Sequence, residues 1–216
     1  MNGKTIAVLE NRAADQFANL VRRYGGQPFC APALAEASDI DAAYISSLLQ
    51  DWRIHPAKVV IFQTGVGAKA LFETTDVLGL TDLLLQLLSE SLVVARGPKP
   101  TAVLRSRNVR IDLSAKEPYT SAEVLEALAS VPLEGERVIV QRYGEPNVEL
   151  DQRLEARGAA VIEIPTYRWA MPANTQPQVE LMDALVGGEI DAVAFTSAVQ
   201  ARNLFAWLNN SSGRNR

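Results

Sequence analysis

Two stretches of the chain follow one pattern: "FQTGVGAKALF", from Phe62 to Phe72, and "FTSAVQARNLF", from Phe195 to Phe205. Aligned at the first Phe, the two copies share Phe, Val, Ala, Leu and Phe at the same positions. Each reads as an apolar strand, a small polar turn and an amphipathic helix. This repeated strand-turn-helix joint indicates duplication of one half-protein, although unrelated βα units can also converge on such a pattern.

Short β-branched runs alternate with helical periodicity along the rest of the chain, which is typical of an α/β fold with parallel sheets. The expected strands are 5–10, 58–64, 91–96, 109–113, 137–143, 160–167 and 191–197. The expected amphipathic helices include 15–25, 97–108, 120–131 and 147–158, and Thr120 with Glu123 forms a capping box at the third of these.

Two Pro- and Ala-rich segments, 33–39 and 164–173, read as linkers between lobes. The span 37–164 between them holds five strands, enough for a complete flavodoxin-like doubly wound sheet. The flanking pieces, 1–34 and 168–216, are expected to form a second lobe together. The residues after Phe205 do not repeat those after Phe72, so we expect this discontinuous lobe to be incomplete at its C-terminus and the activity of this chain to be uncertain.

Composition narrows the classes of function. The chain has 216 residues, a net charge of −4, one cysteine and one histidine. One cysteine cannot form a disulfide within the chain, and one cysteine and one histidine disfavour a zinc site and Ser-His-Asp chemistry. The negative net charge disfavours a general nucleic-acid binder. His55, before Pro56, favours a surface role. The N-terminus lacks a signal-peptide pattern and no apolar run approaches the roughly 20 residues that span a bilayer, so we expect a cytoplasmic protein.

Small residues at a strand's carboxyl end allow a ligand to reach the free N–H groups of the next helix, whose dipole favours anions. Both joints therefore suggest carboxylate binding. The turns "GPKPT", 97–101, and "YGEPN", 143–147, come after further strands and meet the same sheet edge, where open α/β sheets bind ligands. "GVGAKA" also fits the dinucleotide fingerprint, a weak signal here because the next strand ends in Arg96 and not in an acid.

The chain resembles the uroporphyrinogen-III synthase family in the order and spacing of five motifs: "PALAE", "TGVGAKAL", "ARGPKPTAVLR", "VQRYGEPNVELDQRLEARGAAVIEIPTYRW" and "GEIDAVAFTSA". The resemblance covers nearly the whole chain. It implies two flavodoxin-like α/β lobes joined by a two-stranded linker (the HemD-like fold), with the active site in the cleft between them.

Enzymes of this family close hydroxymethylbilane, a linear tetrapyrrole with eight carboxylates, into uroporphyrinogen III, with inversion of ring D and loss of water. The resemblance thus implies a cofactor-free lyase of tetrapyrrole (haem, sirohaem, cobalamin) biosynthesis that needs no metal, nucleic acid or membrane, and we expect a monomer. A tetrapyrrole-sensing module without turnover and an NAD(P)-binding oxidoreductase remain alternatives.

Site residues come from the joints and from the resemblance. Tyr167 matches the family tyrosine suggested to protonate the leaving hydroxyl, and packing on the linker is its alternative role. Arg12 matches the family's basic residue after the first strand. The expected substrate-binding set is Arg12, Thr64, Gly65, Val66, Gly67, Arg96, Gly97, Lys99, Thr101, Tyr143, Gly144, Thr196, Ser197 and Ala198. Trp52 and Trp169 are expected to pack.

Overall fold

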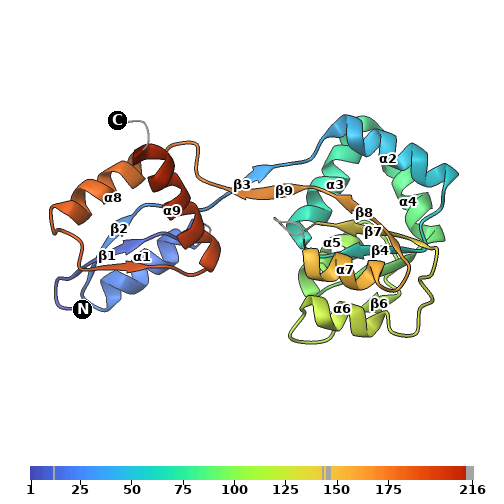
Figure 1. Ribbon diagram of the computed structural model, residues 1–216, viewed down its shortest axis with the longest axis horizontal. Coiled ribbons are helices and arrows are strands. Elements are labelled where there is room, and N and C mark those ends of the chain that lie inside the picture. Colours follow the sequence, from blue (N-terminus) through green and yellow to red (C-terminus); the bar gives the residue numbers. More distant parts are fainter. Residues whose placement is uncertain (12, 143, 145–146, 213–216) are drawn as a thin grey trace. The chain divides into compact units, whose positions relative to one another are not determined.

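The computed structural model describes residues 1–11, 13–142, 144 and 147–212 (Figure 1). The chain divides into two compact units, each built around its own parallel sheet. Unit 1 comprises Met1–Ala37 and Trp169–Arg216, and unit 2 comprises Ser38–Arg168. The fold is α/β with parallel sheets, as the alternation of strand and helix patterns predicts.

A parallel sheet of five strands forms the centre of unit 2 in the described part of the chain. Its strands lie in the order β6 (Leu113–Ser114), β5 (Leu92–Ala95), β4 (Val59–Phe62), β7 (Arg137–Gln141) and β8 (Ala160–Ile164). Numbered within the unit, this order is 3-2-1-4-5, the order of a Rossmann-type sheet, and not the 2-1-3-4-5 order of flavodoxin. The reversal places the switch point of the sheet between β4 and β7, with Phe62 opposite Gln141.

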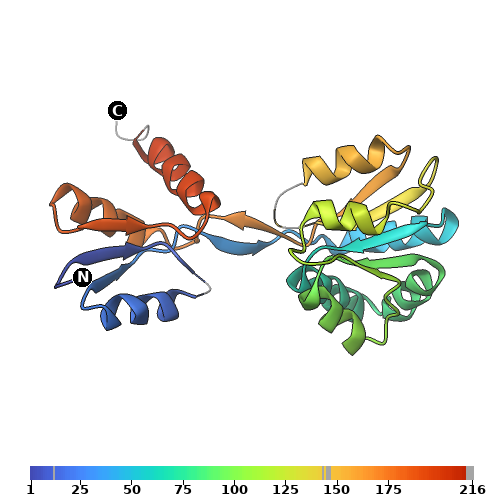
Figure 2. The ribbon, with the colours of Figure 1, turned by 90° about the horizontal axis from the view of Figure 1, so that it is seen from below.

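Helices cover both faces of this sheet because its central strands alternate apolar side chains above and below (Figure 2). One face packs against α2 (Ala42–Ile54), α3 (Gly65–Leu78), α4 (Thr81–Glu90) and α5 (Pro98–Ser106). The other face packs against α6 (Ser121–Ala127) and α7 (Val148–Glu155). Phe62 and Phe72, the first and last residues of the first joint, are fully buried in the first core, whereas Phe195 and Phe205 at the aligned positions of the second joint are exposed.

The sequence prediction of a strand at 109–113 is largely wrong. Only Leu113 and Ser114 pair with β5, and Val109 packs into the helical core instead. Asp112 explains part of the difference, because its carboxylate accepts the Val93 N–H at 2.8 Å. The Asp112 N–H also donates to the Val93 carbonyl oxygen at 2.9 Å, so Asp112 binds β5 through its backbone and its side chain at the point where the strand begins. The capping box predicted at Thr120 and Glu123 is present at the start of α6.

Unit 1 contains a parallel sheet with the order β10 (Ala192–Ala194), β1 (Thr5–Val8) and β2 (Gln27–Cys30) among its described residues. Ala7 and Leu9 pack with α8 (Gln176–Val186) and α9 (Ala198–Ser212), while α1 (Ala14–Arg23) lies on the other face in Figure 2. The strand order reverses at β1, since β2 and β10 flank it on opposite sides. The crevice between the ends of β1 and β10 is therefore the switch point of this unit.

Two further strands, β3 (Ala35–Ser38) and β9 (Tyr167–Ala170), pair as a two-stranded sheet. The division between the two units falls within both strands, inside the segments 33–39 and 164–173. Two contacts anchor the unit 2 end of this sheet: the Asp39 N–H donates to the Thr166 carbonyl oxygen, and the Arg142 guanidinium pairs with Asp39.

Candidate functional site

The first half of the candidate site is the joint between β4 and α3, at the switch point of unit 2. Thr64 caps α3, and its hydroxyl oxygen accepts the Gly67 N–H at 3.0 Å. The Thr64 N–H in turn donates to the side-chain oxygen Oε1 of Gln141, also at 3.0 Å. Since Gln141 ends β7, this bond ties the first turn of α3 to the neighbouring strand.

Gln141 is a fully buried polar side chain whose amide is completely paired. Its Nε2 donates to the Thr166 hydroxyl at 3.1 Å and to the Arg142 carbonyl oxygen, while Oε1 accepts from Thr64. A buried amide without partners would cost several kcal/mol, so these bonds fix the side chain in one position. One neutral group thus holds the ends of β4 and β7 and the residue that precedes β9.

Gly67 is required by this arrangement. A Cβ atom at this position would lie 1.9 Å from Gln141 Nε2 and 2.7 Å from Thr166 Oγ1. The residue lies within a regular helix, so the glycine is needed for the close approach and not for an unusual backbone conformation. The structure therefore gives this predicted ligand residue a buried packing role beneath the joint.

Half-buried Gly65 and exposed Val66 supply the other backbone donors of the joint. In the described part of the chain their backbone N–H groups have no acceptor, as is usual for the first turn of a helix. Gln63, at the end of β4, adds a buried Nε2 without a partner, while its Oε1 accepts from Asn147 at 3.3 Å. Donors without acceptors at a switch point are what an anionic group binds.

The turn before α5 lies beside this joint, because a Cβ on Gly65 would come within 2.9 Å of the Lys99 carbonyl oxygen. Lys99 is exposed, and no carboxylate of the described residues lies within ion-pair distance of it. Arg96 is half-buried. The other two predicted residues face inward: the Thr101 hydroxyl donates to the Gly97 carbonyl oxygen at 2.8 Å, and the Tyr119 ring covers the buried Gly97.

The joint between β10 and α9 in unit 1 is the second copy. Thr196, Ser197 and Ala198 are exposed, as predicted ligand residues should be. The Ser197 hydroxyl oxygen accepts the Gln200 N–H at 3.4 Å, which repeats the Thr64–Gly67 cap at the aligned positions. A buried glutamine amide again lies beneath the joint, because Gln200 Oε1 accepts the Thr196 N–H at 2.8 Å.

The two copies take their buried amide from different places in the chain, and it accepts the Thr64 N–H in unit 2 and the Thr196 N–H, one aligned position earlier, in unit 1. Gln200 aligns with Gly67, so unit 1 supplies the buried amide from the helix itself, whereas unit 2 leaves a gap that Gln141 enters from β7. Sequence reasoning found the joints but missed both glutamines. The one available signal was that Gly67 in the first copy aligns with Gln200 in the second. It points to Gln141 only once the register of β4 and β7 shows which side chain lies against Gly67.

Glu10, just after β1, is a second residue that sequence reasoning missed. Its carboxylate accepts from the Thr196 hydroxyl and from Gln200 Nε2, the latter at 3.1 Å. Burial raises the pKa of Glu10, but the hydrogen bonds from Thr196, Gln200 and backbone N–H groups outweigh it and hold the pKa below its usual value. The joint of unit 1 therefore contains a carboxylate of the chain itself.

A charged cluster surrounds Arg142 at the carboxyl end of β7. The guanidinium pairs with Asp39 and lies 3.7 Å from a carboxylate oxygen of Glu163 in β8. Asp151 in α7 also faces Glu163, and its Oδ1 has no hydrogen-bond partner among the described residues. Burial, followed by the charge and the hydrogen bond of Glu163 and the charge of Glu155, raises the pKa of Asp151 to about 6.

The remaining predicted site residues differ in how the structure places them. Tyr167 in β9 is 4% exposed, so its ring is buried and the proton-donor role stays a prediction. Gly144 is buried with φ of 59°, a conformation that favours glycine. Arg12 and Tyr143 lie outside the described residues.

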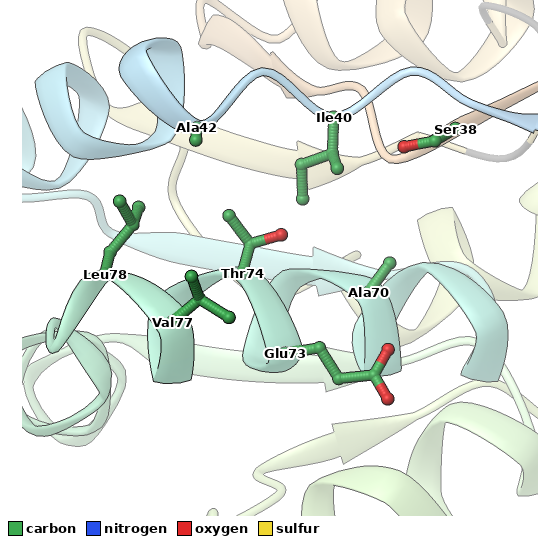
Figure 3. A pocket seen from close by; sticks show the side chains of 8 residues that line it. All are labelled: Ser38, Ile40, Ala42, Ala70, Glu73, Thr74, Val77 and Leu78. Carbon is green, nitrogen blue, oxygen red and sulfur yellow. The ribbon is translucent and has the colours of Figure 1, made fainter.

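A separate hollow of about 370 Å³ lies along the outer side of α3 (Figure 3). Ile40, Ala70, Val77 and Leu78 give it a largely apolar wall, and Figure 3 shows Glu73 at its margin. Glu73 pairs with Lys69 at 3.5 Å. This hollow offers no converging donors and is not part of the candidate site.

Other chemistries find little support in the described part of the chain. No three His, Cys, Asp or Glu side chains gather closely enough there to hold a metal ion. His55 is exposed and pairs with Asp51 at 2.8 Å, in agreement with the predicted surface role, and Cys30 is an exposed thiol. Each helix described is too short or too polar to span a bilayer.

The fold and these joints define a class: α/β proteins with parallel sheets whose candidate ligand groups lie at switch points. Comparisons with known proteins identify the family within that class. The family model described as uroporphyrinogen-III synthase HemD matches residues 15–216. The chain therefore belongs to the uroporphyrinogen-III synthase family, as the sequence resemblance implies.

Individual relatives are distant but align along most of the chain. The Bacillus subtilis protein YjjA is 29% identical over 203 residues, which cover 94% of this chain and 74% of YjjA. A crystal structure of a mutant uroporphyrinogen III synthase from Thermus thermophilus has 26% identity and a TM-score of 0.69, covering 94% and 77% of the two chains. The wild-type enzyme in another crystal form has 25% identity and a TM-score of 0.60, with 94% and 76% covered.

The contact between Gly67 and Gln141 predicts energetic coupling. Gly67→Ala should destabilise the protein by about 1–3 kcal/mol through overpacking, and Gln141→Ala by about 1–3 kcal/mol because the Thr64 N–H loses its acceptor. Removing Gln141 eliminates the closest of the contacts that the new methyl group would make and leaves only the one with Thr166 Oγ1, so the double variant should lose at least about 1 kcal/mol less than the sum. Denaturant titration of all four proteins measures this difference, and additive losses would contradict the packing role.

The raised pKa of Asp151 predicts a pH-dependent stability. The native state holds this proton up to about pH 6, whereas an unfolded aspartate releases it near its ordinary value of 3.8. Stability from this group is thus present at low pH and is lost as pH rises through 6. Asp151→Asn should be more stable than the wild type at pH 7, with the gain disappearing toward pH 4.

Glu149→Gln, an exposed neighbour in α7, is the matched control for this measurement and should show no comparable pH dependence. Thermal unfolding of the three proteins between pH 4 and 7.5 gives the comparison. A constant difference between wild type and Asp151→Asn across this range would refute the assignment.

Proposed function

We propose that the chain is a uroporphyrinogen-III synthase: a cofactor-free lyase that closes hydroxymethylbilane with inversion of ring D and loss of water. The observation that carries the proposal is the β4–α3 joint, where the Gly65 and Val66 N–H groups have no acceptor among the described residues, at a switch point. Membership of the family supports the choice of a tetrapyrrole, a substrate that bears several carboxylates.

The joint suits a carboxylate for two reasons. Its supporting side chain, Gln141, is neutral, so it places no competing negative charge at the N-terminus of α3. Lys99 lies close by and carries a positive charge without an ion-pair partner in the described part of the chain. A propionate or acetate bound to Gly65 and Val66 would therefore meet two backbone donors beside the point where the Lys99 side chain begins.

The proposed chemistry asks for orientation more than for a strong nucleophile. Once the terminal hydroxyl leaves as water, the resulting electrophile reacts with ring D within the same molecule, and the enzyme's task is to favour attack at the substituted carbon. Rigid donors fixed by buried amides meet this need, because their positions do not relax when the substrate binds.

Tyr167 is our proposed proton donor for the departing hydroxyl. A tyrosine has a pKa of about 10 in water and stays protonated at neutral pH, which suits a weak general acid. Its burial in β9 shields the proton from solvent. The same burial also suits a packing role, and kinetics separate the two.

Product analysis tests the proposed function. Hydroxymethylbilane, generated by the upstream enzyme, is incubated with the protein, and the products are oxidised and separated as uroporphyrin isomers. We expect type III product well above the spontaneous reaction. Type I alone would refute the synthase, and tight binding of a uroporphyrin together with type I product would favour a sensing module.

Tyr167→Phe tests the acid. The ring and its packing remain, so folding should be unchanged, while turnover should fall by roughly tenfold to a hundredfold, the lower end of general acid catalysis, because the substrate ionises readily. Tyr44→Phe is the matched control, since it removes a hydroxyl that donates to the Glu163 carbonyl oxygen at 2.8 Å in the same unit. An unchanged rate in Tyr167→Phe would leave this residue a packing role only.

A further inference from the structure

The two joints differ in charge although they share a backbone pattern. At the β4–α3 joint the neutral amide of Gln141 is the supporting group. At the β10–α9 joint the carboxylate of Glu10 accepts from Thr196 and Gln200, and its lowered pKa keeps it ionised near neutral pH. An anion of the chain thus lies at this joint and accepts hydrogen bonds from the Thr196 hydroxyl and the Gln200 side chain.

The hydrogen bonds of the Thr196 hydroxyl leave one acceptor position for a ligand. The Thr196 hydroxyl uses its single proton to donate to Glu10, and its oxygen accepts from Gln200 Nε2 at 2.8 Å. A hydroxyl oxygen has two lone pairs, so one remains. Because the proton is committed to a carboxylate, Thr196 presents itself to a ligand as an acceptor, and the bond to Glu10 makes that oxygen more electron-rich.

We propose that Glu10 is a specificity-determining residue that makes the β10–α9 joint select a hydrogen-bond donor of the ligand, a pyrrole N–H, while the β4–α3 joint selects a carboxylate. The duplicated joints have then acquired opposite preferences. This inference rests on the proposed function for the identity of the ligand, since a linear tetrapyrrole carries both kinds of group.

The structural reason for the difference lies in the buried amides. Gln200 forms part of α9 and bonds to Glu10 and Thr196 together, so it orders the carboxylate against the hydroxyl. Gln141 reaches Thr64 from a strand and bonds onward to the neutral Thr166 hydroxyl. The buried amide of the β10–α9 joint therefore bonds to a carboxylate, whereas the buried amide of the β4–α3 joint bonds only to neutral groups.

The experiment uses a monopyrrole that bears one acetate and one propionate, together with its N-methyl derivative, which keeps both carboxylates and lacks the N–H. Each is titrated into the whole protein while the backbone amide signals of the two joints are followed by NMR. We expect the N–H compound to shift Thr196 and Ser197, and N-methylation to weaken that response about fivefold to tenfold. The response of Gly65 and Val66 should be the same for both compounds.

Glu10→Gln provides a nearly isosteric neutral variant, with Glu189→Gln as a control that removes an exposed charge from the same unit. In Glu10→Gln the preference for the N–H compound at Thr196 should disappear, and it should persist in Glu189→Gln. Equal responses of Thr196 to the two monopyrroles in the wild type would overturn the proposal, whether or not Glu10→Gln folds. The NMR titration measures binding and needs no turnover. If the protein forms only type I product, the proposed synthase activity is refuted, and the titration still decides whether Thr196 selects the N–H compound.

Discussion

The hydrogen bond from the Thr64 N–H to Gln141 Oε1 is the constraint on which the candidate site depends. It joins β4 and β7, the strands of unit 2 between which the direction of winding reverses, and it does so at their carboxyl ends. Gly67 admits the Gln141 side chain, and Thr166 receives an amide proton of Gln141 just before β9. The N–H groups of Gly65 and Val66 have no acceptor in the described part of the chain, whereas those of Thr64 and Gly67 have partners inside the protein.

The repeated joint gives the chain two helix N-termini with one backbone pattern, but the side chains around them differ in chemistry. In unit 2 the buried amide comes from a neighbouring strand, and this neutral group places no negative charge that would repel an anion at the joint. In unit 1 the buried amide belongs to α9 and holds Glu10 against Thr196. We infer that specificity resides in these differences between the copies, which a shared motif conceals.

Local patterns were enough to predict the strand-turn-helix joints, the parallel α/β class and the capping box at Thr120, because each depends on neighbouring residues. Local patterns could not predict the strand order, since sheets with the orders 3-2-1-4-5 and 2-1-3-4-5 have the same alternation of strands and helices along the chain. The strand at 109–113 was largely wrong, because Val109 packs into the helical core and pairing with β5 extends only over Leu113 and Ser114. Gln141 and Glu10 were missed because their partners lie far away in the chain, and only the registers of β7 with β4 and of β1 with β10 bring them together.

Residue-resolved hydrogen exchange at the β4–α3 joint tests the central claim most directly. The account predicts a protected Thr64 amide, because Gln141 accepts its proton, and rapidly exchanging Gly65 and Val66 amides in the free protein. Adding uroporphyrin III, which has the carboxylates of the proposed product, should slow Gly65 and Val66 and leave Thr64 unchanged. Rapid exchange of Thr64 in the free protein, or Gly65 and Val66 amides that do not respond to the ligand, would contradict the account.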